Sequence, residues 1–522
     1  MRKKLLFGLI CVMTFPLQAQ KQRPTDVGEG LHISAVWAAH CHNVSKEIQY
    51  YCYSTQERFF FTFEVEDSTL TLTEPFLSEA DVEPEDRVEL FFSPTREMQE
   101  YYCMEIDPKG RVLDYKARYY RQFDYNWNFA SLKVTAMITP WGYRIGGSLL
   151  RSELEQLGCD LENGFWMGIF QDDFKQDGSV IWHSYIRSED TVPDFHKPDI
   201  LFPCVMHPKQ EYQGVVVYPN DITSVGLKEW KRRIRQSGIN LIGLHAATSN
   251  DPLDTLAAFV QSRTGRQFLR ICRRMHVDVE YEVHALLHLL PRELYSTHPE
   301  FFRMDTNGQR VADYNLCFSN EEAVKAMEPQ LAAILQWMKP TTHRYFFWPD
   351  DKQEKFCHCE KCRHYSPSEQ SLMYEKALLK MILAYDPKAK LAHLAYHQTQ
   401  AAPVKVRADS GIFLEFAPIL RNYDYPLPPE SDKVLQENML AFNTCPPHIL
   451  EYWLDESMYA HWKRNALVPL PFQPESCRRD IRYYRETGAT SITCFATWLN
   501  GDYLRLFGST EAVFTSYRHC FE

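Results

Sequence analysis

The sequence predicts a multidomain fold in which an N-terminal antiparallel β-sandwich (residues 24–205) precedes a (β/α)8 TIM barrel (residues 210–522). Up to about residue 205, short strands alternate with turns; from about residue 212, apolar strands alternate with amphipathic segments of helical period. A chain of 522 residues is long enough for two to four domains. The stretch "FPCVMHPKQEYQ" (202–213) is the expected boundary.

The strands of the first half are separated by clear turn signals. "RFFFTFEVED" (58–67) and "EDRVELFFSP" (85–94) are apolar runs, and the second ends at a proline. "EYYCMEIDPKGRVLDYKARYY" (100–120) predicts a hairpin that turns at Asp-Pro-Lys-Gly. Two further strands are expected at 142–150 and 164–173. This spacing is typical of an antiparallel sandwich.

The second half contains eight apolar strands, each expected to be followed by a helix. Two of the helical segments are "TSVGLKEWKRRIRQSG" and "QSLMYEKALLKMILAYDP". Eight such units predict a closed (β/α)8 barrel, and an open sheet is the alternative if one of the eight strands is wrong. The strands begin with "GVVVYPND", "INLIGLHA", "VDVEYEVHALLHLL", "RYFFWPDD", "LAHLAYH", "IFLEFAP", "HILEYWLDE" and "SITCFATW".

The first twenty residues, "MRKKLLFGLICVMTFPLQAQ", combine a basic start with an apolar stretch and a small residue at Ala19. This pattern predicts a signal peptide over residues 1–19 and an exported, periplasmic or secreted protein. No later stretch reaches the ~18 apolar residues that a membrane span needs. The net charge of −11 argues against nucleic acid as the main partner.

Polar and aromatic residues recur where the predicted barrel strands end, which is where such barrels place their active sites. Carboxyl pairs can supply the acid and the base or nucleophile of glycoside hydrolysis, and aromatic rings stack on sugars. The alternative is that these residues are polar only because the loops that follow the strands are exposed to solvent. The catalytic candidates are Asp350, Asp351, Glu415, Glu451 and Asp455, and the substrate-binding candidates are His284, Tyr396, His397, Trp453 and Trp498. Asn220, Asp221, His245, His288, Tyr452, Glu456, Asn500 and Asp502 also follow these strands.

Asp350 and Asp351 stand out because they come directly after the apolar run "YFFW". Burial and the neighbouring like charge would raise the pKa of one carboxyl, which suits a general acid. We therefore expect Asp350 to be the acid, Asp351 to position or polarise the substrate, and Glu415 or Glu451 to be the base or nucleophile. Asp455 is a further candidate for that second role.

Fourteen of the fifteen cysteines follow the predicted signal peptide, and most stand singly in apolar contexts that suggest the core. Cys357, Cys359 and Cys362 form one cluster, and Cys317 lies within reach upstream. Four such ligands suit a structural zinc site, which would fix the loop after the fourth strand. A disulfide, as expected of an exported protein, and free thiols remain open alternatives.

Three stretches of the second half resemble a known family: "HPEFFRMDTNGQRVADYNLCFSNEEAV", "FFWPDDKQEKFCHCEKC" and "LAHLAYHQTQAAPVKV". They resemble domain-of-unknown-function family 4838, a barrel family of the glycoside hydrolase group that is common in gut Bacteroidota. The resemblance covers roughly residues 210–500 and implies a TIM barrel that acts on sugars. Many members carry Asn-Asp-Gly where this chain has Pro-Asp-Asp, so Asp350 matches the shared Asp and Asp351 departs from the pattern.

That departure weakens the case for a paired-Asp mechanism like that of the hexosaminidase barrels, which place two acidic residues after the fourth strand. "HPEFF" also resembles α-glucuronidases of family 67. There the acid follows the fourth strand and the bases come from later strands, which implies Glu415, Glu451 or Asp455 as the partner of Asp350.

The first half resembles a family 9 carbohydrate-binding module over roughly residues 24–205. The matching stretches are "DRVELFFSP", "YYCMEIDPKGRVLDYKARYYRQFDYNW", "WMGIFQDDF" and "FHKPDILFP". Such modules hold a sugar between tryptophans, which implies Trp127 and Trp166 as binding residues with Arg121 and Asp124 as polar partners. The bland interpretation is that these residues belong to the sandwich core.

Together these observations predict an exported protein that binds an oligo- or polysaccharide and hydrolyses O-glycosyl bonds, with zinc as the one implied cofactor. One alternative is a non-catalytic glycan-binding protein whose barrel has lost its chemistry. Another is a metal-dependent hydrolase of a non-sugar substrate, although three thiolates would weaken the metal as a Lewis acid.

Overall fold

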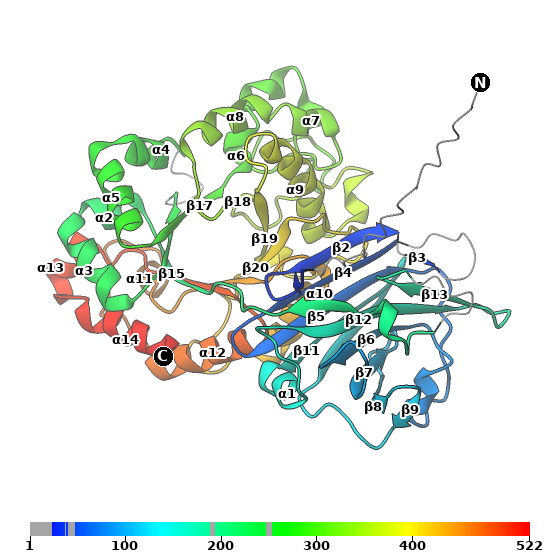
Figure 1. Cartoon of the computed structure of the whole chain (residues 1–522). Helices are drawn as coiled ribbons and strands as arrows, with labels where there is room; N and C mark the ends of the chain where they lie inside the picture. The colour runs from blue at the N-terminus through cyan, green and yellow to red at the C-terminus, as the bar shows by residue number, and fades with distance from the viewer. Residues whose placement is uncertain (1–22, 37, 40–46, 188–193, 247–252) are drawn as a thin grey trace, which may run out of the picture.

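The computed structural model describes residues 23–36, 38–39, 47–187, 194–246 and 253–522 (Figure 1). The predicted signal peptide lies outside the described residues. None of the helices among the described residues has the length and apolar character needed to span a bilayer.

Two β-sheets pack face to face in the first half and enclose a hydrophobic core. The five-stranded sheet has the order β10 (Lys133–Thr139), β11 (Gly142–Leu150), β5 (Arg58–Glu66), β4 (Glu47–Ser54), β2 (Leu31–Val36). The larger sheet runs β1 (Thr25–Asp26), β14 (Phe202–Val205), β12 (Phe165–Phe174), β6 (Arg87–Ser93), β7 (Tyr101–Ile106), β8 (Val112–Arg118), β9 (Gln122–Asp124). At its side, β13 (Val180–Ser184) pairs with β12 and with β3 (Ala38–Ala39).

The prediction of a wholly antiparallel sandwich was wrong. β1 pairs with β14 in parallel, with Thr25 opposite Cys204, so the larger sheet is mixed. The parallel pair arises because the first and last strands of the sandwich lie side by side at the edge of the sheet. The short β1 therefore joins an existing edge rather than forming a hairpin.

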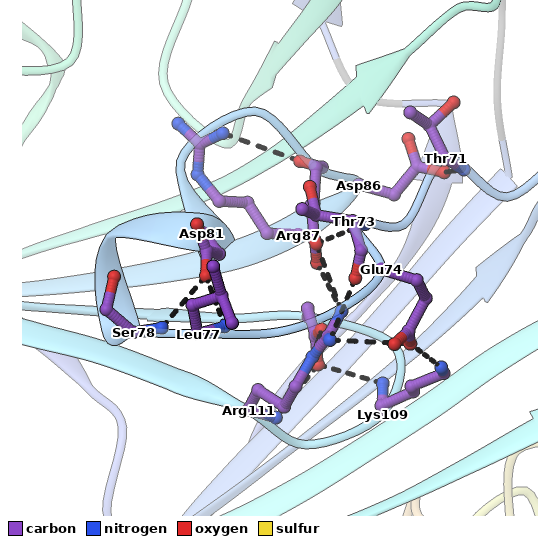
Figure 2. Close-up of polar contacts among 12 residues, drawn as sticks. Thr71, Thr73, Glu74, Leu77, Ser78, Asp81, Asp86, Arg87, Lys109 and Arg111 are labelled. Atoms are coloured by element: carbon purple, nitrogen blue, oxygen red, sulfur yellow. Dashed lines mark hydrogen bonds and ion pairs between the residues drawn. The ribbon is translucent and has the colours of Figure 1, made fainter.

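The segment between β5 and β6 is tied to the sandwich by polar contacts, several of which Figure 2 shows. Arg111 follows β7, and its guanidinium lies 2.8 Å from the Glu85 carboxylate. The same guanidinium lies 3.6 Å from the Glu74 carboxylate. The Thr71 amide donates to Asp86 at 2.6 Å. Within the segment, η1 (Glu79–Val82) begins where the Leu77 and Ser78 amides donate to Asp81. These contacts fix the segment against the end of the larger sheet.

Eight parallel strands of the second half close into a barrel. Their apolar and β-branched residues suit parallel strands that are buried on both faces. In order around the barrel the strands are β15 (Tyr212–Val217), β16 (Leu241–His245), β17 (Asp278–His284), β18 (Arg344–Trp348), β19 (Lys390–Ala395), β20 (Ile412–Phe416), β21 (His448–Glu451) and β22 (Ser491–Phe495).

The prediction of a regular (β/α)8 TIM barrel, with a helix after every strand, was wrong. Between β19 and β20 the chain forms only a 3-10 turn, η6 (His397–Thr399), followed by irregular residues up to 411. The sandwich occupies this place instead. The Arg144 guanidinium donates to the Pro403 carbonyl at 3.3 Å, and the Trp141 indole donates to the Val404 carbonyl at 3.2 Å.

The other connections differ widely in length and helical content. After β15 come α2 (Pro219–Thr223) and α3 (Leu227–Ser237), and before β17 come α4 (Leu253–Gln261) and α5 (Arg263–Arg274). The β17–β18 connection holds α6 (Leu286–Leu289), η3 (Arg292–Ser296), η4 (Pro299–Phe301), α7 (Glu321–Lys325) and α8 (Glu328–Trp337). The later connections hold η5 (Cys362–His364), α9 (Pro367–Leu383), α10 (Pro429–Ala441), α11 (Glu456–Tyr459) and α12 (Pro474–Glu486), and the chain ends with α13 (Gly501–Phe507) and α14 (Glu511–Phe521).

The five-stranded sheet faces the barrel, and α10 packs against β10 and β11 (Figure 1). Alternate residues of β5 therefore have different partners: Phe61 lies in the sandwich core, and Glu64 forms an ion pair with Arg407 of the barrel. Nearby, the buried Tyr53 hydroxyl donates to the Gly488 carbonyl at 2.8 Å. The sandwich thus covers one flank of the barrel.

Replacing Tyr53 with phenylalanine should lower the free energy of unfolding by about 1–3 kcal/mol, because it leaves the Gly488 carbonyl without its buried donor. Urea denaturation of the full chain measures this change. The matched control is Tyr385→Phe, at a tyrosine that is 53% exposed. Equal stability of the two variants would contradict a stabilising contact between the sandwich and the barrel.

Candidate active site

A cavity of about 110 Å³ lies at the carboxyl ends of the barrel strands; we call it the mouth cavity. A smaller cavity of about 40 Å³, the side cavity, shares His284, Asp351, Leu394 and Tyr396 with it. Parallel barrels gather their functional residues at this end. The mouth cavity is lined by Tyr218, His245, His284, Trp348, Asp351, Leu394, Tyr396, Ile419, Leu450, Tyr452, Asp455, Ser457, Trp462 and Phe495.

Aromatic rings form much of the wall of the mouth cavity. Tyr452 and Phe495 stack with ring centroids 5.3 Å apart. Trp348 packs against His245 at 5.4 Å and against His284 at 5.1 Å. Its buried indole donates to the Glu415 carboxylate at 2.7 Å, which fixes the ring plane. Such a wall offers flat apolar faces together with polar edges.

The two histidines are held by carbonyl groups. His245 Nδ1 lies 2.7 Å from the Glu282 carbonyl oxygen, and His284 Nδ1 lies 2.6 Å from the Pro349 carbonyl oxygen. A carbonyl oxygen only accepts, so each Nδ1 donates. Burial lowers the pKa of His245 to about 3, and that ring is therefore neutral at pH 7.

Asp455 lies between β21 and α11 and lines the mouth cavity. Its Oδ1 accepts hydrogen bonds from the Ser457 amide at 3.0 Å, from the Ser457 hydroxyl at 2.5 Å and from the Thr497 hydroxyl. Burial raises the pKa of Asp455 although these bonds oppose the shift. These hydrogen bonds hold the carboxyl group of Asp455 in one position.

Asp351 contributes a carboxylate in a different environment. It is exposed, and it lines both the mouth cavity and the side cavity. Tyr396 lines the same two cavities, and burial raises the pKa of its hydroxyl, with Asp351 and Asp455 as further causes. The structure therefore brings an exposed and a buried carboxyl to one cavity.

Asp350 lines only the side cavity and is 5% exposed. Its Oδ1 accepts from the Leu287 amide at 3.1 Å, and its own amide donates to the Asn315 side chain at 2.9 Å. Burial raises the pKa of Asp350 to about 6, while the Leu287 amide and Arg292 lower it. His397 lines the side cavity as well, and burial lowers its pKa.

This shift predicts a pH dependence of stability. The pKa of Asp350 rises from its ordinary 3.8 to about 6, so the unfolded chain ionises first. Stability should fall as the pH rises from about 4 to about 6, by about 3 kcal/mol for this group. In Asp350→Asn this part of the slope should be absent in denaturation curves, whereas the exposed control Asp199→Asn should keep it. An unchanged slope in Asp350→Asn would contradict the assignment.

Glu415 and Glu451 do not line these cavities. The Glu415 carboxylate accepts from Trp348 as described, and burial raises its pKa. Glu451 pairs at 3.1 Å with the fully buried guanidinium of Arg421, which also contacts Asp480 at 2.5 Å. Both carboxylates therefore support the barrel from positions outside the mouth cavity.

The two predicted tryptophans of the barrel lie apart from the mouth cavity. The buried Trp453 donates its indole N–H to Asp480 at 3.3 Å. Trp498 lines a neighbouring cavity of about 190 Å³ together with Tyr218, Asp221 and Arg464. The Arg464 guanidinium lies 5.3 Å from the centre of the Trp498 ring. Tyr218 belongs to both cavities and so lies between them.

The structure does not bring the predicted sugar-binding residues of the sandwich together. Trp127 packs against the core between the sheets, whereas Trp166 packs against a separate hydrophobic cluster that includes Phe91 and Phe170. Arg121 pairs with Asp194 at 3.0 Å. Near Arg121 along the chain are three aromatic side chains that the sequence did not single out; they are about half exposed: Tyr119, Tyr120 and Tyr125.

Sequence reasoning did not assign a role to several residues of the mouth cavity. Trp348 is the last residue of β18, and its inward direction became visible only with the strand register. Tyr218 follows β15, and Phe495 ends β22. Trp462 is 61% exposed and follows α11 in a turn with positive φ, which gives no periodic signal.

The predicted cysteine cluster is compact. Cys317, Cys357, Cys359 and Cys362 are buried, and their Sγ atoms lie within 4.8 Å of one another. No disulfide joins any two of the cysteines that the structure describes. Cys317 comes from the β17–β18 connection, and the other three cysteines come from the segment after β18.

Comparisons with known proteins found distant neighbours. No curated protein matches the chain. A carbohydrate binding module family 9 from Caldicellulosiruptor kristjanssonii in complex with glucose has 10% identity and a TM-score of 0.25, and the match covers 34% of this chain and 84% of that chain. A beta-N-acetylhexosaminidase from Bacteroides fragilis has 11% identity and a TM-score of 0.38, and the match covers 61% of this chain and 68% of that chain. The GH20 modules of the pneumococcal exo-beta-D-N-acetylglucosaminidase StrH have 11% identity and a TM-score of 0.35, and the match covers 60% of this chain and 82% of that chain.

The sequence of the second half also matches a family model. Residues 249–500, which include the strands from β17 to β22, match the family described as Domain of unknown function (DUF4838).

Proposed function

We propose that this chain is an exported glycoside hydrolase that binds a glycan at the mouth cavity and hydrolyses an O-glycosyl bond there. One observation carries the proposal: the exposed Asp351 and the buried Asp455 line the same cavity, whose wall is rich in aromatic rings. Glycosidases need a protonated and an ionised carboxyl on either side of the scissile bond. One carboxyl of this cavity is buried and the other is exposed, and such a contrast suits a division of the two roles.

Asp455 is the proton donor in this proposal. Its buried carboxyl has a raised pKa, and the Ser457 and Thr497 hydrogen bonds leave it no freedom to turn away. It protonates the glycosidic oxygen as the bond to the leaving sugar breaks. Asp351, exposed to solvent, either takes the proton of a water that attacks the sugar carbon, or attacks that carbon itself and is then released by water.

Asp350 positions Asp351 rather than donating the proton. Its Oδ1 is engaged by the Leu287 amide, and its buried Oδ2 has no hydrogen-bond partner among the residues that the structure describes. The backbone of Asp350 is fixed by the Asn315 side chain. A group so enclosed stabilises the loop from which Asp351 reaches the cavity.

The aromatic wall would bind the sugar ring. Trp348 and Tyr452 offer ring faces, and the His284 side chain and the Tyr396 hydroxyl lie beside them as polar partners. In the sandwich, the half-exposed Tyr119, Tyr120 and Tyr125 form a second place where a glycan would stack, with Arg121 next to them. The sandwich would thus add glycan binding to the action of the barrel.

A screen of the full chain against oligosaccharides and polysaccharides of varied linkage tests the proposal. Reducing-end release measures turnover, and calorimetry measures binding. We expect at least one glycan to be cleaved. If a variant that lacks the carboxyl of Asp351 or of Asp455 still cleaves the glycan at the wild-type rate, the role assigned to that residue is contradicted.

A non-catalytic glycan-binding protein is the second candidate, and one observation favours it. Glu415 and Glu451 lie outside the cavities. The cavities are therefore lined by fewer of the predicted catalytic carboxyls than the sequence suggested. Under this alternative, wild type and Asp455→Asn bind the same glycan with similar affinity, and neither cleaves it.

A further inference from the structure

The Sγ atoms of four cysteines from two segments of the chain lie within 4.8 Å of one another. Cys317 comes from the β17–β18 connection, before α7, and the other three come from the loop that follows β18. Each is at most 7% exposed. The Sγ of Cys317 lies 3.7 Å from that of Cys359 and 3.9 Å from that of Cys362.

These separations match the edges of a metal–thiolate tetrahedron. Zinc binds cysteine sulfur at about 2.3 Å, so neighbouring sulfurs of a tetrahedral site with four cysteine ligands lie about 3.8 Å apart. We propose that Cys317, Cys357, Cys359 and Cys362 bind one Zn²⁺ in a closed, structural site. Each thiol gives up its proton to solvent as the sulfur coordinates the ion.

Polar groups that can donate hydrogen bonds lie next to the sulfurs. The Met304 amide donates to Cys357 Sγ at 3.3 Å, and the Arg310 guanidinium lies 3.8 Å from the same sulfur. The Ser319 hydroxyl lies 3.2 Å from Cys362 Sγ. A zinc ion with four thiolate ligands carries two net negative charges, which N–H donors and a nearby arginine offset.

The alternatives account less well for four converging sulfurs. Disulfides would join the sulfurs in pairs at about 2.05 Å. The Cys317 sulfur instead lies at nearly equal distances, 3.7 and 3.9 Å, from two other sulfurs. Isolated thiols act as small hydrophobes, as the described Cys272 does in the barrel core. Four thiols from two segments have no packing reason to converge with polar donors around them.

The ion would hold together the two segments on which Asp350 depends. Asn315, two residues before Cys317, accepts from the Asp350 amide at 2.9 Å and donates to the Lys355 carbonyl at 3.1 Å. On the other side, the Gln370 side chain of α9 accepts from the Cys357 amide at 3.0 Å. Zinc would therefore stabilise the loop that presents the neighbouring Asp351 to the cavities.

Metal analysis of the full chain, purified without chelator, is the first test. We expect one zinc per chain by mass spectrometry of the digested protein. Replacement by Co²⁺ should give the sulfur-to-metal charge-transfer bands and the intense visible bands of a tetrahedral tetrathiolate. Absence of bound metal, iron in place of zinc, or a disulfide within the cluster in the intact protein would each overturn the proposal.

Single substitutions then localise the ion. Cys359→Ser and Cys317→Ser should lose most of the zinc, whereas the buried control Cys272→Ser should keep it. Removal of the metal from wild type should speed proteolysis between residues 302 and 365. Zinc kept in full by Cys359→Ser would contradict the site even if that variant is less stable. These measurements do not depend on turnover, so their outcome is separate from that of the proposed hydrolase function.

Discussion

Replacing Asp455 with asparagine is expected to lower the turnover of the cleaved glycan by about 10²–10⁴-fold, the usual contribution of a positioned general acid. Asparagine keeps the size of the side chain and an oxygen that can accept from Ser457 and Thr497. It lacks the proton that the leaving sugar needs. Stopped assays of reducing-end release measure kcat, and KM should change little because the aromatic wall is intact.

The pH dependence of activity distinguishes a proton donor from a residue that only supports the structure. Burial raises the pKa of Asp455, so in wild type activity should fall as the pH rises above that pKa, where the donor is lost. This basic limb should be absent from the residual activity of Asp455→Asn. The control Asp199→Asn replaces an exposed carboxyl of the sandwich and should retain full turnover. Normal kcat in a folded Asp455→Asn would remove Asp455 from the mechanism.

Strand position was predictable from the sequence, but the direction of each side chain was not. The predicted barrel strands coincide with the parallel strands of the closed barrel because long apolar runs between turn signals are a strong pattern. At the end of β21, however, Glu451 points to Arg421 whereas the next residue, Tyr452, lines the mouth cavity. Neighbouring strand residues face opposite sides, so an error of one residue exchanges a catalytic candidate for a structural one.

The sequence also could not show that contacts with the sandwich replace the helix that was expected between β19 and β20. Residues 400–411 contain Pro403 and Gly411 and lack a helical apolar period, yet the eightfold count suggested a regular unit. In the structure Arg144 and Trp141 of the sandwich bind this segment. Such pairing over more than 250 residues leaves no local signal. The cysteine cluster was easier to predict, because three of its members lie within six residues.

Arg421→Met should destabilise the protein by about 3–5 kcal/mol, because it leaves the Glu451 and Asp480 carboxylates buried without their shared cation. The Arg421 and Glu451 side chains are fully buried, and that of Asp480 is 2% exposed. Urea denaturation of the full chain measures the loss. The matched control is Arg505→Met, which breaks an exposed pair with Asp502 and should cost about 0–1 kcal/mol.

The same ion pair decides between two roles for Glu451. The Arg421 guanidinium lowers the pKa of Glu451, but burial outweighs it and raises that pKa to about 7, a value that would also suit a general acid. If Glu451 is structural, Glu451→Gln lowers stability while kcat per folded molecule stays near that of wild type. If Glu451→Gln remains stable and loses turnover as Asp455→Asn does, the reacting sugar reaches β21 and the site lies deeper than the mouth cavity. Because the Tyr484 hydroxyl and Arg421 both engage the Oε1 atom of Glu451, the geometry favours the structural role.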